Sequence, residues 1–328
     1  MKTTARLVGA GLVLAVGISG GVAGNAGAAT SYSFAVIGDL PYGSTELGLF
    51  PGKIKQINAD PDVRMVGHLG DIGTGNCSTS YYQKILANFE TFVDPLVYTP
   101  GDNEWADCHR ASVGQANPLE RLSAVRSIFF PTAGRTLGQN KLSVTAQSGY
   151  KENVSFAAGG LALATLHVVG SENDLRPWNG LGFSKATTAQ VSEVTARVAA
   201  AAAQVRSVFS EAKAADSRAV VLMTQADMFA PGTQNAGYRN AFQSVVRTIA
   251  SESKSFQRPV FLFNGDTHSY LQDRPLMSSK WLSFYGVSGS VPNLTRVTIK
   301  GAAGVNEWIK ANVVLGSEVL QIQRVAYR

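Results

Sequence analysis

Four aspartates, each preceded by a glycine at the end of an apolar run, are the residues of this chain best suited to chemistry: Asp39, Asp71, Asp102 and Asp266. The runs before them are typical of buried strands. Each carboxylate is therefore expected at the carboxyl tip of a strand, where open α/β sheets bind ligands. Four carboxylates in one crevice repel each other unless cations lie between them. The pattern predicts a metal site; the alternative is four unrelated turns, since glycine and aspartate both favour turns.

The histidines limit the kind of metal that such a site would take. The chain has only four, and two of them, His68 and His167, lie in apolar runs where we expect packed core residues. Carboxylates with one or two imidazoles form an oxygen-rich site, which favours Mn, Fe, Mg or Ca over a thiolate-type Zn site. Two divalent or trivalent ions held there would polarise a phosphoryl oxygen and activate a water molecule.

Predicted strands and helices alternate along most of the chain, which is typical of α/β proteins. Strands are predicted from apolar runs at 34–37, 66–69, 96–100, 161–169, 219–224 and 260–264. Helices are predicted from apolar periodicity or from caps at 53–58, 78–93, 117–130, 187–208 and 242–249.

Two of these helices have clear start signals. Asn117 is a suitable N-cap, Pro118 suits the first helical position, and Glu120 lies three residues after the cap. Thr187 and Gln190 have the spacing of a capping box.

The remaining segments differ in composition and in the pattern of their apolar residues. Residues 132–150 are rich in glycine and serine and are predicted as a surface loop. After the fourth strand tip, we expect antiparallel strands and no helix at 281–285, 294–299, 306–315 and 319–325. With no internal repeat or linker, the prediction is one α/β domain in which two packed mixed β-sheets are flanked by helices.

The first 29 residues are predicted to be a secretory signal peptide, which leaves residues 30–328 as the mature domain. Lys2 and Arg6 precede an apolar, glycine-rich stretch, and small residues near 28–29 suit cleavage. An uncleaved anchor is the alternative. No second long apolar run follows, so no membrane span is expected after removal, and the protein should be secreted. Loss of Lys2 and Arg6 lowers the formal net charge from +6 to +4. That charge is too small to indicate a nucleic-acid-binding surface.

The two cysteines, Cys77 and Cys108, are predicted to form a disulfide, because exported chains encounter oxidising conditions. Each follows a predicted strand-tip aspartate by six residues, so the bond would join two loops of the site. Two free thiols are the alternative.

The order of the strand-tip motifs resembles that of the calcineurin-like metallophosphoesterases. The four segments are Gly38-Asp39-Leu40-Pro41, Gly70-Asp71-Ile72-Gly73, Gly101-Asp102-Asn103-Glu104 and Gly265-Asp266-Thr267-His268. The family's corresponding motifs are Asp-x-His, Gly-Asp-x-x, Gly-Asn-His-Asp/Glu and Gly-His-x-His, with a lone histidine after another strand. The resemblance covers most of residues 30–328 and implies a four-layer arrangement of two sheets between helices.

The resemblance also implies roles for several residues. Asp39 and His268 would bind the first metal ion, and Asp71 would bridge both ions. Asp102 stands where the family has a ligating asparagine, and Gln225 stands where it has the lone histidine.

Other positions depart from the family pattern. Asp266 replaces a ligating histidine, although Gly-Asp-x-His is similar to the last motif of the alkaline phosphatase D-like branch. Pro41 replaces a histidine and cannot bind a metal. Asn103 replaces the histidine that assists the substrate or leaving group, and an amide cannot act as an acid at neutral pH. His109 is the candidate to stand in for that missing acid.

These features predict a metal-dependent phosphoesterase that hydrolyses phosphate mono- or diesters, small or polymeric, with a metal-activated water. The alternative is a catalytically weak or inactive binding protein with the same fold, because several motif residues are replaced. A serine hydrolase of the Gly-Asp-Ser-Leu type is a third hypothesis, but Leu40 occupies the place of its nucleophile. Arg110 and Arg176 have guanidinium groups suited to phosphate, but they are predicted in loops and are left outside the predicted site.

Overall fold

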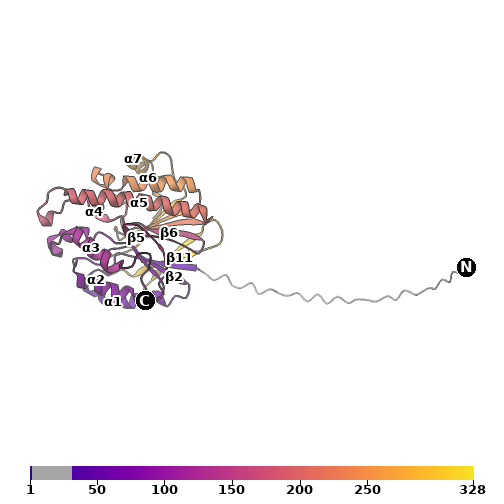
Figure 1. Cartoon of the computed structure of the whole chain (residues 1–328), viewed down its shortest axis with the longest axis horizontal. Helices are drawn as coiled ribbons and strands as arrows, with labels where there is room; N and C mark the ends of the chain where they lie inside the picture. Colours follow the sequence, from indigo (N-terminus) through magenta and orange to yellow (C-terminus); the bar gives the residue numbers. More distant parts are fainter. Residues whose placement is uncertain (2–31) are drawn as a thin grey trace. The chain divides into compact units, whose positions relative to one another are not determined.

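Apolar runs form the central strands of two mixed β-sheets in the computed structural model, which describes Met1 and residues 32–328 (Figure 1). The five strands of the first sheet lie in the order β12 (Leu320–Ala326), β11 (Glu307–Val313), β1 (Tyr32–Ile37), β2 (Val63–His68) and β3 (Leu96–Tyr98). The seven strands of the second sheet lie in the order β4 (Thr145–Gln147), β5 (Tyr150–Ala158), β6 (Leu161–Thr165), β7 (Ala219–Met223), β8 (Val260–Asn264), β10 (Leu294–Thr298) and β9 (Leu271–Asp273). The central strands β1–β2–β3 and β6–β7–β8–β10 are parallel, and the outer strands pair antiparallel.

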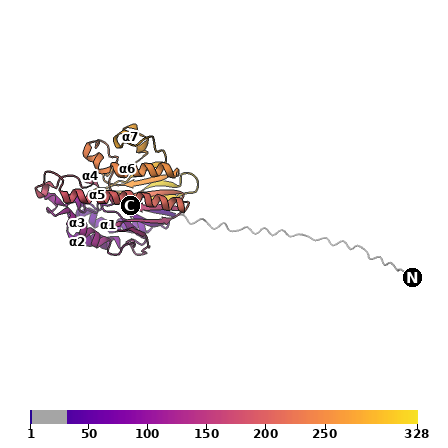
Figure 2. The ribbon, with the colours of Figure 1, turned by 45° about the horizontal axis from the view of Figure 1, so that its top comes forward.

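Helices cover the outer faces of both sheets, which gives four layers (Figures 1 and 2). The first sheet is covered by α1 (Gly43–Asn58), α2 (Thr79–Phe89) and α3 (Pro118–Phe129). The second sheet is covered by α5 (Thr188–Ala214), α6 (Ala236–Phe256) and α7 (Ser279–Tyr285). The short α4 (Gly170–Asn173) and four 3₁₀ turns lie in connections, at Ala106–His109, Ala111–Val113, Asn179–Leu181 and Pro275–Met277. The predicted fold class, two packed mixed sheets flanked by helices, is confirmed.

The side chains of β1 alternate between two apolar layers. Phe34 and Val36 belong to the apolar layer between the sheets, whereas Ala35 and Ile37 belong to the layer under the helices. Successive side chains of a strand point to opposite faces, so a strand buried on both faces must be apolar throughout.

The register of the parallel strands brings their carboxyl ends to one edge. Ile37 of β1 pairs with His68 of β2, and His68 pairs with Tyr98 of β3. Asp39, Asp71 and Asp102 follow these strands and therefore start from neighbouring points of one sheet edge.

Both predicted helix starts are confirmed. The side chain of Asn117 accepts a hydrogen bond from the backbone N–H of Leu119, and Pro118 opens α3. Thr187 and Gln190 make both bonds of the capping box that opens α5.

The prediction of a strand at 281–285, and of no helix after the fourth strand tip, is wrong. This segment lies in α7, where Trp281 and Tyr285 are four residues apart and stack with ring centroids 5.8 Å apart. Both residues are buried against the second sheet's helical layer. A short aromatic run does not distinguish a strand from a helix by periodicity alone.

Two further boundaries need correction. Residues 132–150 are not loop throughout, because β4 lies within them and β5 begins at Tyr150. The buried part of β5 contains the polar residues Glu152 and Asn153, which obscured the strand in the sequence. The helix predicted at 53–58 begins instead at Gly43 and includes Pro51.

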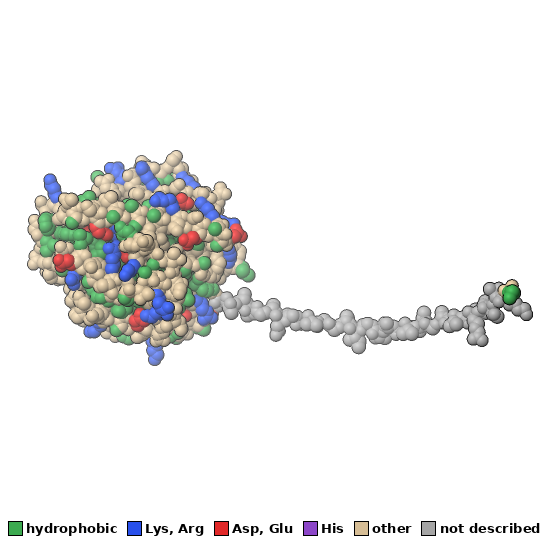
Figure 3. Space-filling view, in the orientation of Figure 1, with side chains coloured by type: hydrophobic (Ala, Val, Ile, Leu, Met, Phe, Trp, Pro, Cys, Tyr) green, Lys and Arg blue, Asp and Glu red, His purple; other side chains and the backbone are tan. Residues whose placement is uncertain are grey.

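The predicted signal peptide, residues 1–29, lies outside the described residues apart from Met1. Within residues 32–328, no helix has both the length and the apolar character needed to cross a bilayer. On the face shown in Figure 3, Lys and Arg side chains are spread over the surface with Asp and Glu among them.

Candidate metal centre

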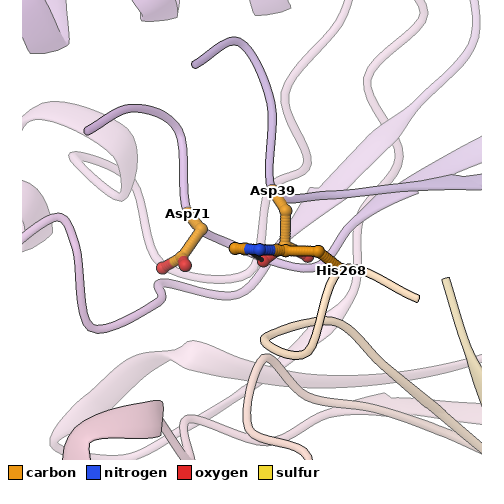
Figure 4. A group of neighbouring side chains, drawn as sticks. All are labelled: Asp39, Asp71 and His268. Carbon is orange, nitrogen blue, oxygen red and sulfur yellow. Dashed lines mark ion pairs between the residues drawn. The ribbon is translucent and has the colours of Figure 1, made fainter. Parts of the chain in front are cut away.

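Asp39, Asp71 and His268 point toward one another at the edge where the strands end (Figure 4). One ligand atom from each residue lies within 4.8 Å of the others. All three residues have backbone φ angles in the left-handed region, 50°, 56° and 60°. Non-glycine residues in this conformation are uncommon and tend to occur at functional sites. The turns aim the three side chains at a common point.

Asp39 is the deepest of the three and links the two sheets. It is fully buried, and its Oδ1 accepts a hydrogen bond of 3.0 Å from the backbone N–H of Asp266. The same oxygen lies 3.2 Å from Nε2 of His268. A Cβ at Gly265 would lie only 2.1 Å from Oδ2 of Asp39, so the close approach requires glycine there.

Asp71 is held by hydrogen bonds from three donors. Its Oδ2 accepts bonds from the Tyr42 hydroxyl at 2.7 Å and the Asn103 amide at 3.1 Å. Its Oδ1 accepts the backbone N–H of Asn103 at 3.2 Å. Asn103 also donates to the Tyr42 oxygen at 2.8 Å, so these three side chains form a closed triangle. The Tyr42 oxygen lies 3.4 Å from Nε2 of His268.

Asp102 and Asp266 form the second acidic part of the site. The Oδ2 of Asp102 and the Oδ1 of Asp266 lie 2.7 and 2.8 Å from the position that a Cβ would take at Gly170, so both carboxylates converge above this glycine. The Oδ1 of Asp102 accepts a 3.0 Å bond from the amide of Gln225. The Oδ2 of Asp266 accepts the backbone N–H of Asp227 at 3.3 Å.

In the described part of the chain, the four strand-tip aspartates have no lysine or arginine partner. Among residues 32–328, the contact of His268 with Asp39 is the only ion pair that any of them makes. Burial raises the pKa of Asp39, and it raises the pKa of Asp71 and of Asp266 well above the usual range. The negative charge of Asp102 is the next largest cause for Asp71 and Asp266. Hydrogen bonding to Asp39 raises the pKa of His268.

These observations fit bound cations. Buried carboxylates that repel each other are stabilised either by protonation or by metal ions. The donor set of carboxylates and one imidazole suits Mn, Fe, Mg or Ca.

A cavity of about 390 Å³ opens above the acidic cluster. Its lining includes most of the predicted site residues: Asp71, Asp102, Asn103, Asp266 and His268. The lining also carries polar and charged residues that were not in the predicted site: Asp107, Arg110, Ser171, Glu172 and Arg176.

Besides the fully buried Asp39, two predicted site residues do not line the cavity. His109, predicted as a substitute acid, is not among the residues that line the cavity, and its Nδ1 accepts the backbone N–H of Gly180 at 3.3 Å. Gln225, predicted as a ligand, is fully buried behind Asp102. Its amide donates to Asp102 and accepts the backbone N–H of Gly170 at 2.6 Å. The amide therefore positions Asp102 and Gly170 from behind the cavity.

The two histidines predicted as core residues are fully buried, as expected. His68 donates from Nε2 to the backbone oxygen of Leu40 at 3.0 Å and accepts the N–H of Gly70 on Nδ1 at 3.3 Å. Burial lowers the pKa of His68 to about 3. His68 thus supports the backbone beside both Asp39 and Asp71. His167 pairs with Glu152 over 2.8 Å.

The predicted disulfide is present. Cys77 and Cys108 are bonded, with Cα atoms 5.9 Å apart. The bond joins the loop that follows Asp71 to the 3₁₀ turn that follows Asp102 and Asn103.

Tyr42 is the site residue that the sequence reasoning missed. It lines the cavity, contacts Asp71 and packs edge-on against His268 with ring centroids 5.4 Å apart. Burial raises its pKa, and the charge of Asp71 raises it further, so the phenol keeps its proton. The one signal in the sequence was its position three residues after Asp39, directly after the tip segment.

Comparisons with known proteins give only similarities of architecture. No protein-family model matches the chain, and no curated protein matches it. Among solved structures, the chain is similar to GAP50, described as the anchor in the inner membrane complex of Plasmodium. That match has 9% identity and a TM-score of 0.48, and it covers 91% of this chain and 89% of the other. The chain is also similar to TT1561 of Thermus thermophilus, with 10% identity, a TM-score of 0.43 and coverage of 90% and 99%.

Proposed function

We propose that this protein is a metal-dependent phosphoesterase of the calcineurin-like kind, acting on small or polymeric phosphate mono- or diesters. The observation that carries the proposal is the three-donor group of Asp39, Asp71 and His268, whose ligand atoms lie within 4.8 Å of one another. This group adjoins two further carboxylates and a cavity large enough for an organic phosphate. None of the four strand-tip aspartates has a lysine or arginine partner among the described residues.

The residues divide into two ligand groups. Asp39, Asp71 and His268 would hold one ion, and Asp102 and Asp266, with Asp71 between, would hold a second. Ions at such a site polarise a phosphoryl oxygen and lower the pKa of bound water. Tyr42 and Asn103 fix the orientation of Asp71 through its Oδ2.

Asn103 gives the cavity a hydrogen-bond donor but no acid. Its amide can bind a substrate oxygen, yet it cannot protonate a leaving group at neutral pH. General acid catalysis typically contributes about 10²–10⁴-fold. We therefore expect substrates with good leaving groups, such as nitrophenyl esters, to be hydrolysed far faster than alkyl phosphates.

The test combines metal analysis with hydrolysis of 4-nitrophenyl phosphate and bis(4-nitrophenyl) phosphate. Wild-type protein loaded with Mn²⁺ should hydrolyse at least one of them, and Asp71→Asn should abolish turnover. Asp216→Asn, at a surface carboxylate with 86% exposure, is the matched control and should be unchanged. Metal-loaded wild-type protein that hydrolyses neither ester would contradict the proposal.

A second candidate function is cation-dependent binding without turnover. It is favoured by one observation: His268 is the only imidazole that lines the cavity in the described chain, and it is engaged by Asp39. A stoichiometric metal content, with phosphate bound and no hydrolysis, would support this function over the first.

We further propose that the chain is exported and that residues 1–29 are removed. The disulfide supports this proposal, because such bonds persist in oxidising compartments. Mass spectrometry of protein collected from the medium of expressing cells would test it. The expected result is the mass of a chain that begins at Ala29 or Thr30.

A further inference from the structure

Two arginines lie on the wall of the cavity that opens above the acidic cluster. Arg110 and Arg176 both line the cavity, and their side chains are 45% and 57% exposed. They come from different segments, one after β3 and the other after α4. The cavity therefore has an acidic end, where Asp102 and Asp266 converge, and two guanidinium groups elsewhere on its lining.

Arg110 is held in place through only one of its nitrogens. Its Nη2 lies 2.6 Å from Oδ2 of Asp107 and donates to the Ser171 hydroxyl at 3.3 Å. Ser171 in turn donates to Oδ1 of Asp107 at 2.7 Å. Nε and Nη1 of Arg110 have no partner in the described part of the chain. The buried Asp107 thus orients a guanidinium whose other donors remain for a ligand.

The segment 171–174, which contacts Arg110 through Ser171, has an unusual backbone conformation. Four consecutive residues, 171–174, have φ angles of 49°, 55°, 58° and 67°. L-residues rarely adopt a left-handed turn of this length. Buried Arg197 holds the turn in place by donating to the backbone oxygen of Asn173 at 3.0 Å, and its Nε pairs with Glu193 at 2.9 Å. The turn places Ser171 and Glu172 on the cavity wall.

Arg176 belongs to the same wall. It lies 4.0 Å from Glu172, a loose pairing that leaves the guanidinium mostly exposed. Ser171 and Glu172 are adjacent in the chain, and they contact Arg110 and Arg176 respectively, so one turn links the two arginines.

The cavity volume exceeds the needs of one phosphate group. At about 390 Å³ it holds the equivalent of about thirteen water molecules, at roughly 30 Å³ each. A phosphate placed at the acidic end would leave room for an organic group that reaches the arginines.

We propose that Arg110 and Arg176 bind a second anionic group of the substrate, so that the preferred ligand is a phosphoester with another phosphate or similar anion beyond the scissile one. This inference rests on the proposed function for the acidic end. The part of the cavity wall that carries Arg110 and Arg176, the arginine wall, can nevertheless be tested by binding alone. Guanidinium forks match phosphate oxygens bidentately, and the anion would take donors that Asp107 leaves free.

The test uses a matched pair of ligands that cannot be hydrolysed, propane-1,3-diphosphonate and propylphosphonate. Their affinities for the full-length, Mn²⁺-loaded protein are measured by calorimetry. Wild-type protein should bind the diphosphonate at least about tenfold more tightly, as expected for one added charge-assisted contact. The double variant Arg110→Ala/Arg176→Ala should lose this preference and keep the affinity for propylphosphonate within about threefold.

Two controls make the result specific. Arg206→Ala removes an exposed arginine outside the cavity and should leave the preference intact. Arg110→Lys/Arg176→Lys keeps the charges and should retain part of the preference, while thermal unfolding shows that each variant is folded. A preference that persists in the alanine double variant, or equal affinity of wild-type protein for the two ligands, would overturn the inference. Absence of hydrolysis with an intact, arginine-dependent preference would contradict only the proposed function.

Discussion

The backbone N–H of Asp266 donates to Oδ1 of Asp39 over 3.0 Å, although 227 positions separate the two residues in the chain. Asp39 follows the first strand of one sheet, and Asp266 follows β8 of the other. The bond therefore joins the two sheets at the edge where their parallel strands end. The acidic cluster exists only when both sheets are packed together, so metal binding should be coupled to folding.

Replacing Tyr42 with phenylalanine should weaken metal binding without unfolding the protein. The change removes the 2.7 Å hydrogen bond to Asp71 and the partner of the Asn103 amide. Loss of a group that orients a metal ligand typically costs about 10–100-fold in affinity. Titration with Mn²⁺ measures the effect. Tyr270→Phe, which removes an exposed hydroxyl bonded to Gln272, is the control, and equal affinities of the two variants would exclude this role for Tyr42.

Replacing Gln225 with leucine should destabilise the fold. The buried amide satisfies both the N–H of Gly170 and a carboxylate oxygen of Asp102. Leaving such groups unpaired costs about 1–3 kcal/mol each. Urea unfolding in the presence of chelator measures this cost apart from any effect on metal binding. An unchanged unfolding midpoint would show that water or relaxation satisfies both groups.

Removing the disulfide should also destabilise the protein. Cys77 and Cys108 are 31 positions apart, and closing a loop of that length stabilises the folded state by about 3–4 kcal/mol in the chain-entropy model. The double variant Cys77→Ser/Cys108→Ser should therefore unfold at lower urea concentration. Its affinity for metal should fall as well, because the bond restrains the loops after Asp71 and Asn103. A fall in stability with unchanged metal affinity would limit the bond to a structural role.

His68 should make stability depend on pH. Its folded-state pKa of about 3 lies below the ordinary 6.5, because burial disfavours the charged ring. The unfolded chain therefore takes up the proton first as the pH falls. The contribution of His68 is complete above about pH 6.5 and is lost as the pH falls toward 3, by about 1.4 kcal/mol per pH unit. His68→Gln should flatten this part of the curve of unfolding free energy against pH. Parallel curves for the variant and the wild type would contradict the assignment.

The strand tips could be predicted because parallel strands buried on both faces leave continuous apolar runs in the sequence. The glycine and aspartate after each run then mark its end. Tyr42 was missed because it lies beyond the tip, and only the turn after Asp39 brings its hydroxyl back to Asp71. The position of His109 could not be read from the sequence either: it lies at the end of the 3₁₀ turn that follows Asn103, and its ring turns toward Gly180.

The strand β5 could not be predicted from the sequence, because it contains buried polar residues that are each paired with a polar side chain of another segment. Glu152 is fully buried and contacts both His167 and Arg126, and Asn153 bonds to Gln147. Such partners come from other elements, so no local pattern reveals that these polar residues are internal. The place of Arg110 and Arg176 in the cavity was not evident from the sequence for a similar reason. The turn at 171–174 brings these two distant residues to the same cavity wall.

The central claim is that cations hold the buried aspartates together, and metal analysis of the purified protein tests it most directly. Protein purified without chelator and dialysed should retain at least one Mn, Fe, Mg or Ca ion per chain, and addition of Mn²⁺ after chelator treatment should raise the unfolding temperature. Asp71→Asn should lose both effects, and Asp216→Asn should keep them. Wild-type protein that binds no such ion, and whose unfolding temperature does not change with Mn²⁺ or chelator, would contradict the account.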